Sequence, residues 1–211
     1  MSKIILDLCG GTGSWSKPYK EAGYDVRLVT LPDNDVLTYK PPDNVYGILA
    51  APPCTMFSIA RNDTTAKEPR DLRKGMELVR ACLEVIWECR YEPIRKNENN
   101  LKFWALENPR GYLVDFLGQP YYKFHPYDFG DPYTKLTCLW GNFNIPIKNP
   151  TIPMRFGNGE GTFVKEVEHF AHLKEFQIPE GYQAKTGYTK RTIMRSITSS
   201  GFAKAFFEAN Q

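Results

Sequence analysis

Residues 4–13 read IILDLCGGTG, an apolar run that leads directly into a turn rich in glycine. Short continuous apolar runs are typical of strands buried in a parallel sheet. Glycines after such a strand let the backbone approach a ligand closely at the carboxyl edge of the sheet. The segment therefore predicts a first strand and a binding loop, although similar turns also hold phosphates or no ligand at all. The spacing does not match the GxxxxGK[ST] phosphate loop.

The rest of the chain alternates short apolar runs with segments of helical spacing. These segments predict helices at 16–23, 71–90 and 201–209, and strands at 25–31, 45–51, 103–106 and 136–140. Such alternation is typical of an α/β fold, with a mainly parallel sheet flanked by helices. Residues 142–192 lack periodicity, and we expect an irregular insert there with a short helix near 165–174. A chain of 211 residues fits a single domain spanning residues 1–211.

The composition limits the possible partners and cofactors. The formal net charge of +3 permits an anionic partner without requiring one. Five cysteines without a CxxC pair, together with three histidines, argue against a structural metal site and against a disulfide framework. No apolar stretch approaches the roughly 20 residues that span a bilayer, and the N-terminus does not resemble a signal peptide. We therefore expect a cytoplasmic protein with reduced thiols, no metal and no membrane contact.

A cysteine follows the predicted strand 45–51, within the sequence APPCTMFS at residues 51–58. The two prolines fix the backbone direction, so the Cys54 thiol is expected to face a crevice at the sheet edge. A nucleophilic cysteine needs its thiolate form, which nearby cations favour. The alternative is a small apolar residue that only caps the strand.

A glutamate follows the predicted strand 103–106 in the same way, in the sequence Glu107-Asn108-Pro109. Because parallel strands share a carboxyl edge, Glu107 is expected to point into the same crevice as Cys54. Burial beside apolar neighbours would raise its pKa and make it a proton donor near neutral pH. The alternative is a surface carboxylate that caps the next turn.

Together with the sequence GDPYTK at 130–135, these motifs resemble, in this order, the cytosine-5 DNA methyltransferase family. The resemblance covers nearly the whole chain except about 142–192. It implies a Rossmann-like S-adenosylmethionine-dependent fold that transfers a methyl group to carbon 5 of cytosine in DNA. In that reaction Cys54 adds covalently to carbon 6 while Glu107 assists at N3, and a duplex substrate needs its base flipped out. The implied catalytic residues are Pro53, Cys54, Glu107, Asn108, Lys135 and Thr137.

The resemblance also assigns binding residues. Those implied for S-adenosylmethionine are Asp7, Cys9, Gly10, Gly11, Thr12, Gly13, Thr30, Leu31, Asp35, Val36 and Ser200. The final motif, around Thr198 to Gly201, is expected to return beside the first glycine loop. The residues implied for the DNA substrate are Ser58, Arg61, Arg110, Lys190 and Arg191. The segment between Ser58 and Arg70 is expected to close over the flipped base, or else to be only a connector.

The chain departs from the family pattern at several of these positions. Thr30 and Leu31 stand where the family commonly has an acid, and Ser200 replaces the usual asparagine. Lys135 and Thr137 stand where arginines are usual, so a slower reaction or a changed grip on the substrate is expected. Only about 50 residues occupy the place of the recognition domain, and their basic and aromatic side chains suit either nucleic acid or a solvated surface.

This compact form, expected to be monomeric, resembles enzymes of phages and mobile elements that take part in restriction-modification. Two other functions stay open: methylation of RNA or of a free nucleotide, and binding without catalysis. The presence of both Cys54 and Glu107 argues against a non-catalytic protein.

Overall fold

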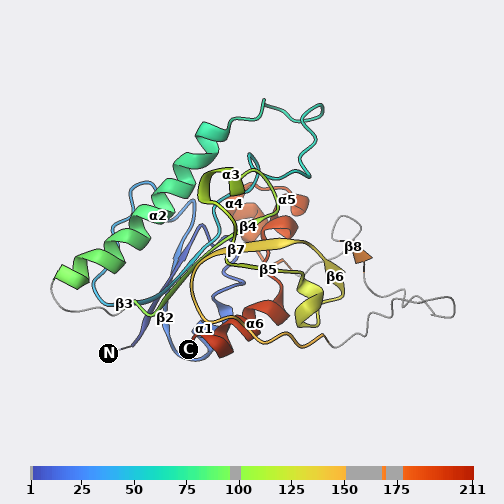
Figure 1. Ribbon diagram of the computed structural model, residues 1–211. Coiled ribbons are helices and arrows are strands. Elements are labelled where there is room, and N and C mark those ends of the chain that lie inside the picture. Colours follow the sequence, from blue (N-terminus) through green and yellow to red (C-terminus); the bar gives the residue numbers. More distant parts are fainter. Residues whose placement is uncertain (1, 96–100, 151–167, 170–177) are drawn as a thin grey trace.

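The computed structural model describes residues 2–95, 101–150, 168–169 and 178–211. A sheet of six strands, in the order β2-β1-β3-β4-β7-β5, forms the centre of the molecule (Figure 1). Its strands are β1 (Ile4–Leu8), β2 (Asp25–Val29), β3 (Val45–Ala50), β4 (Phe103–Pro109), β5 (Tyr122–Phe124) and β7 (Thr137–Asn142). All strands predicted from the sequence are present, whereas β5 carried too short a pattern to be predicted.

The first four strands of this order run parallel to one another. β1 pairs with β2 on one side and with β3 on the other, and β3 pairs with β4. Side chains on β1 and β3 are buried on both faces, which explains why both strands are almost wholly apolar. This mainly parallel sheet flanked by helices is a Rossmann-like fold, as the sequence predicted.

The remaining two strands of the sheet, β7 and β5, are joined to it by antiparallel pairing. β7 lies antiparallel between β4 and β5. Pairing with β7 also extends β4 beyond the predicted end at Leu106, because Glu107 lies opposite Leu139 and Asn108 opposite Cys138. Glu107 and Asn108 are therefore held by sheet hydrogen bonding rather than by a free loop.

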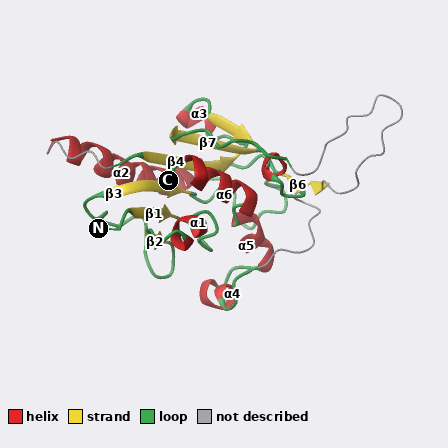
Figure 2. Cartoon of the chain, turned by 90° about the horizontal axis from the view of Figure 1, so that it is seen from below, coloured by secondary structure: helices red, strands yellow, loops and turns green. Residues whose placement is uncertain are grey.

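Helices cover both faces of the sheet (Figures 1 and 2). On one face, α2 (Leu72–Arg95) packs its apolar side chains against residues such as Leu6 and Ile48. On the other face, α1 (Lys17–Glu21) and α6 (Ser200–Ala209) pack against residues such as Ile5 and Leu49. Successive residues of a strand thus supply opposite cores, as a period of two requires.

Short elements lie around the sheet. They are α3 (Val114–Leu117), a 3-10 turn at Pro126–Phe129, the pair β6 (Tyr133–Thr134) and β8 (Glu168–His169), and the helices α4 (Tyr182–Thr186) and α5 (Lys190–Ser196). The helix expected near 165–174 is wrong at Glu168–His169, which pair with β6 as a strand; its other residues lie outside the described ranges. Among the described residues no helix combines the length and apolar character needed to cross a bilayer.

Candidate active site

The loop after β1 adopts backbone conformations that favour glycine. Gly11 and Gly13 have φ angles of 57° and 71°, and Cys9 also has a positive φ of 55°. A Cβ at Gly10 would overlap the carboxyl group of Asp7. The loop therefore depends on its glycines for shape, and it lies at the carboxyl end of β1 as the sequence predicted.

Asp7 is fully buried at the base of this loop. Its Oδ2 accepts a hydrogen bond of 2.5 Å from Ser16 Oγ. Burial raises the pKa of the Asp7 carboxyl to about 6, although the bond from Ser16 acts in the opposite direction. Asp7 Oδ1 and Thr12 Oγ1 are both buried and have no hydrogen-bond partner among the described residues.

These two atoms test whether the loop suits S-adenosylmethionine. The amino-acid end of that cofactor carries an ammonium group, which donates, and a carboxylate, which accepts. A carboxylate oxygen and a hydroxyl group without partners are the complementary groups, and buried polar atoms need such partners. The residues present therefore fit the cofactor's amino-acid end at this loop.

The C-terminal segment returns beside the glycine loop, as predicted. The backbone N–H of Thr198 donates a 2.9 Å hydrogen bond to Ser14 Oγ. A Cβ at Gly11 would lie 3.3 Å from the hydroxyl of Tyr182 in α4. Lys185 of the same helix forms an ion pair with Asp33, which follows β2. α4 therefore bridges the glycine loop and the turn after β2.

The other residues expected at the cofactor surround this turn. Thr30 is half-buried and its carbonyl accepts from Asn34 N–H at 3.0 Å, whereas Leu31 is exposed. Asp35 accepts a 3.0 Å bond from the backbone of Leu37, and Val36 is buried in the core that faces α2. Leu31 is exposed and can contact a ligand. The Asp35 carboxylate instead accepts a hydrogen bond from the backbone within its own turn. Roles for these residues toward a cofactor stay predictions.

Ser200 is the first residue of α6. Its side chain is exposed and contacts Asp131. Its hydroxyl donates a 3.5 Å hydrogen bond to Asp131, and the N–H of Gly201 donates a 3.1 Å bond to the same carboxylate. Asp131 thus caps α6, a contact that the sequence did not predict. A role for Ser200 at the cofactor stays a prediction.

The segment after β3 presents Cys54. The N–H groups of Phe57 and Ser58 donate to the carbonyl of Cys54 at 3.0 and 2.9 Å, which forms a tight turn. This turn packs against the chain that follows β4, since Tyr112 N–H donates to Phe57 O at 2.9 Å. A Cβ at Gly111 would overlap that same carbonyl oxygen. The turn that carries Cys54 is therefore held against the chain at Gly111 and Tyr112.

Three charged groups act on the Cys54 thiol. Burial raises its pKa, Lys135 lowers it, Glu107 raises it, and Arg195 lowers it, in that order of size. Such effects require the charges to lie close to the sulfur. The parallel register of β3 and β4 places Cys54 and Glu107 at the same edge of the sheet, and the charges of Lys135 and Arg195 of α5 act on the same thiol. The catalytic roles of Cys54, Glu107 and Lys135 stay predictions. Arg195 follows the segment 142–192, and no sequence pattern marked it out.

Glu107 is the half-buried acid of this group. Burial raises the pKa of its carboxyl, and the ammonium group of Lys135 lowers it less strongly. The rise in pKa is the one expected from the sequence, and a role for Glu107 as proton donor stays a prediction. Its neighbour Asn108 is buried and donates a 3.0 Å hydrogen bond from Nδ2 to the carbonyl of Pro52. This bond ties the end of β4 to the segment that carries Cys54, while Pro53 is exposed.

Lys135 and Thr137 lie on the other side of Glu107. Lys135 Nζ donates a 3.1 Å hydrogen bond to the carbonyl of Arg195, so it joins the segment just before β7 to α5. Thr137 is buried and its hydroxyl donates to the carbonyl of Lys135 at 3.0 Å. Thr137 therefore shapes the turn that holds Lys135, and a contact with a substrate stays a prediction.

The residues expected at a nucleic acid differ in exposure. Arg110, Lys190 and Arg191 are exposed, and Ser58 is half-buried. Arg61 is largely covered by its own segment and pairs with Asp63. Within the described ranges no group of three or more His, Cys, Asp or Glu could hold a metal ion.

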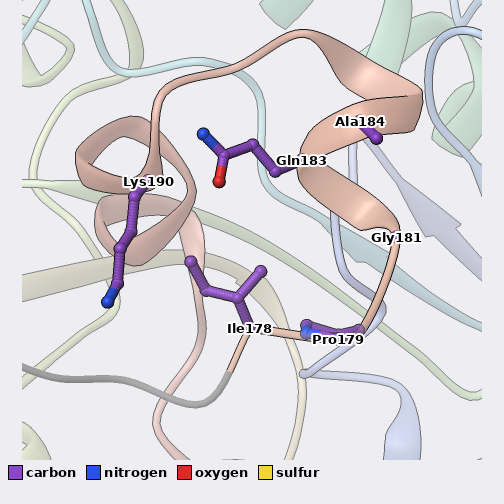
Figure 3. A pocket seen from close by; sticks show the side chains of 6 residues that line it. All are labelled: Ile178, Pro179, Gly181, Gln183, Ala184 and Lys190. Carbon is purple, nitrogen blue, oxygen red and sulfur yellow. The ribbon is translucent and has the colours of Figure 1, made fainter.

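A surface hollow lies between α4 and the start of α5 (Figure 3). It is lined by Ile178, Pro179, Gly181, Gln183, Ala184 and Lys190. Neither Cys54 nor Glu107 lines it, so this hollow is distinct from the cluster of titratable groups described above.

Comparisons with known proteins identify no family for this chain. No family model matches it, and no curated protein matches it. Among solved structures, a triple mutant of DNMT2 from Spodoptera frugiperda is 18% identical with a TM-score of 0.37, covering 85% of this chain and 56% of its own. The methyltransferase EhMeth from Entamoeba histolytica is 11% identical with a TM-score of 0.34, covering 77% and 58%.

The chain thus spans little more than half the length of each neighbour. These scores are too low to indicate a function. The class of protein, Rossmann-like α/β, follows from the sheet itself.

Proposed function

We propose that the chain is an S-adenosylmethionine-dependent methyltransferase that modifies carbon 5 of cytosine in DNA. The observation that carries the proposal is the grouping of Cys54, Glu107 and Lys135 at the sheet edge that also holds the glycine loop. A thiol, a carboxyl with a raised pKa and an ammonium group are the functions that activation of a pyrimidine ring requires.

In the proposed reaction the Cys54 thiolate adds to carbon 6 of the ring. Glu107 donates its proton to N3 as negative charge develops there, so carbon 5 becomes electron-rich. The cofactor supplies the methyl group that carbon 5 accepts. Loss of the proton from carbon 5 to a base that we leave unassigned then expels the Cys54 thiolate, and N3 returns its proton to Glu107. Lys135 stabilises the thiolate before attack and after release.

A second candidate substrate is RNA or a free cytosine nucleotide. The observation that favours it is the segment 142–192, which offers only about 50 residues at the place where the resembling family has a recognition domain for duplex DNA. Transfer of a tritiated methyl group to duplex DNA, transfer RNA and dCMP in parallel distinguishes these substrates. Label in DNA alone supports the first proposal, whereas label in either other substrate replaces it.

The mechanism is tested with a DNA oligonucleotide that contains 5-fluorocytosine. Fluorine at carbon 5 prevents the final proton loss, so wild-type protein and S-adenosylmethionine should give a covalent adduct that survives denaturation. Peptide mapping should place the adduct at Cys54, and Cys54→Ala should abolish it. Absence of an adduct, or an adduct that persists in Cys54→Ala, refutes the assignment.

A further inference from the structure

Two arginines and one aspartate form a cluster in the segment that follows Cys54. Arg61 Nε lies 2.8 Å from Asp63 Oδ1, and Arg70 Nε and Nη2 each lie 3.1 Å from Asp63 Oδ2. One carboxylate therefore faces two guanidinium groups. The arginine side chains are only 8% and 16% exposed, whereas that of Asp63 is 50% exposed. Asp63 is thus the outer member of the cluster.

Most of the remaining donors of these arginines bind the turn that begins at Cys54, while Arg61 Nη2 donates to the carbonyl of Glu68. Arg70 Nη1 donates to Met56 O at 2.7 Å and to Ser58 O at 3.3 Å. Arg61 Nη1 donates to Thr55 O at 3.5 Å. Because these carbonyls belong to the turn that begins at Cys54, the position of the guanidinium groups and that of the turn depend on each other.

A pair of guanidinium groups suits more than one kind of anion. The planar arginine fork matches the oxygens of a carboxylate or of a phosphate, and both anions form charge-assisted hydrogen bonds with it. A surface hollow reaches Arg70; it is lined by Glu68, Pro69, Arg70, Asp71, Leu72 and Lys74. An anion can therefore approach Arg70 from solvent, although Glu68 and Asp71 limit the local positive potential.

We propose that Arg61 and Arg70 form a subsite for a backbone phosphate of the nucleic acid, and that Asp63 occupies this subsite until nucleic acid binds. The inference rests on the proposed function. A phosphate that displaces Asp63 replaces one anion with another, so the guanidinium groups stay paired and keep their bonds to the turn after Cys54. Asp63 is a positioning residue that sets the free-energy cost of opening the subsite.

The experiment measures binding to a cytosine-containing duplex oligonucleotide by fluorescence anisotropy at several salt concentrations. Cys54→Ala serves as the parent protein, so the result does not depend on catalysis. Asp63→Asn should tighten binding by about threefold to tenfold, because no carboxylate has to be displaced. The matched control Glu68→Gln removes the same charge from the same segment without a side-chain contact to either arginine, and it should change binding less than about twofold.

A second arm tests whether Asp63 acts through the arginines. Arg70→Gln should lower the slope of log affinity against log salt by about 0.9, the value for one phosphate contact in duplex DNA. In the Arg70→Gln background, Asp63→Asn should no longer tighten binding. This dependence on Arg70 is not expected of a residue whose role is only structural.

Four outcomes overturn the proposal. Equal tightening by Glu68→Gln shows a general charge effect, and weaker binding by folded Asp63→Asn shows a purely structural role. An unchanged salt slope in Arg70→Gln excludes the phosphate contact even where Asp63→Asn fails to fold. A parent that binds no DNA overturns the DNA substrate as well, whereas the first three outcomes leave the covalent trap at Cys54 untouched.

Discussion

The buried carboxyl of Asp7 makes stability depend on pH in a direction opposite to that of most carboxylates. Its pKa rises from 3.8 to about 6 on folding. The folded state therefore holds a proton between these values that the unfolded state has lost, and stability falls as pH rises through this window. At about 1.36 kcal/mol per pH unit, the ionised form costs roughly 3 kcal/mol above pH 6.

Asp7→Asn removes this ionisation while keeping the shape of the side chain and an acceptor for Ser16 Oγ. At pH 7.5 the variant should be about 1–3 kcal/mol more stable than wild type, because the amide needs no ionisation in the core. At pH 4 the advantage should vanish, since wild-type Asp7 is then largely protonated in the folded protein. The measurement is urea unfolding followed by tryptophan fluorescence at half-unit steps between pH 4 and 8.

The informative quantity is the difference in the free energy of unfolding between wild type and Asp7→Asn. Glu107 and Asp131 also have raised pKa values, and both contribute equally to the two unfolding series. Asp43→Asn at an exposed position controls for the lost charge. A difference that stays constant across this pH range would show that Asp7 does not titrate there. A variant less stable than wild type at pH 7.5 would refute the reasoning that burial makes the ionised carboxylate costly.

Three further predictions concern the turn at Cys54. Lys135→Met should raise the pKa of the Cys54 thiol, since Lys135 lowers that pKa, and should therefore slow alkylation of Cys54 by iodoacetamide at pH 8 about threefold to tenfold. Glu107→Gln should speed the alkylation, because Glu107 raises the pKa of the thiol. Peptide mass spectrometry measures both rates. Faster alkylation in Lys135→Met would contradict the assignment. Asn108→Ala leaves the carbonyl of Pro52 without its donor and should cost about 1–3 kcal/mol in urea unfolding, with methyl transfer falling more than cofactor binding. Gly111→Ala should lower the free energy of unfolding by a similar amount, because its Cβ would overlap Phe57 O. The control is Gly23→Asn, at a position with open space around it. A loss of stability in Gly111→Ala no larger than in this control would count against the contact.

The parallel half of the fold was predictable because its strands are marked by apolar runs with glycine or proline at their ends. β5 and β8 were not predictable, since three- and two-residue strands carry no periodicity and depend on partners far along the chain. The position of Glu107 was predicted, but not the reason for it, which is the antiparallel pairing with β7. Arg61 was named from the sequence, but its pairing with Asp63 beside Arg70 was not, and Arg195 carried no pattern of its own. The partners of these side chains are backbone carbonyls and charges that only folding brings near.

The electrostatics of the site explain how one partly buried cluster can serve as both the proton donor and the nucleophile of the proposed reaction. Burial alone disfavours both the thiolate of Cys54 and the carboxylate of Glu107, and the carboxylate further raises the pKa of the thiol. If Glu107 stays protonated, that last effect disappears, and Lys135 then faces a thiolate without a competing anion. The protonation state that lets Glu107 donate to N3 is therefore also the one that favours attack by Cys54. Burial favours the protonated form of Glu107, so the raised pKa of this acid helps the proposed reaction both at N3 and at the sulfur.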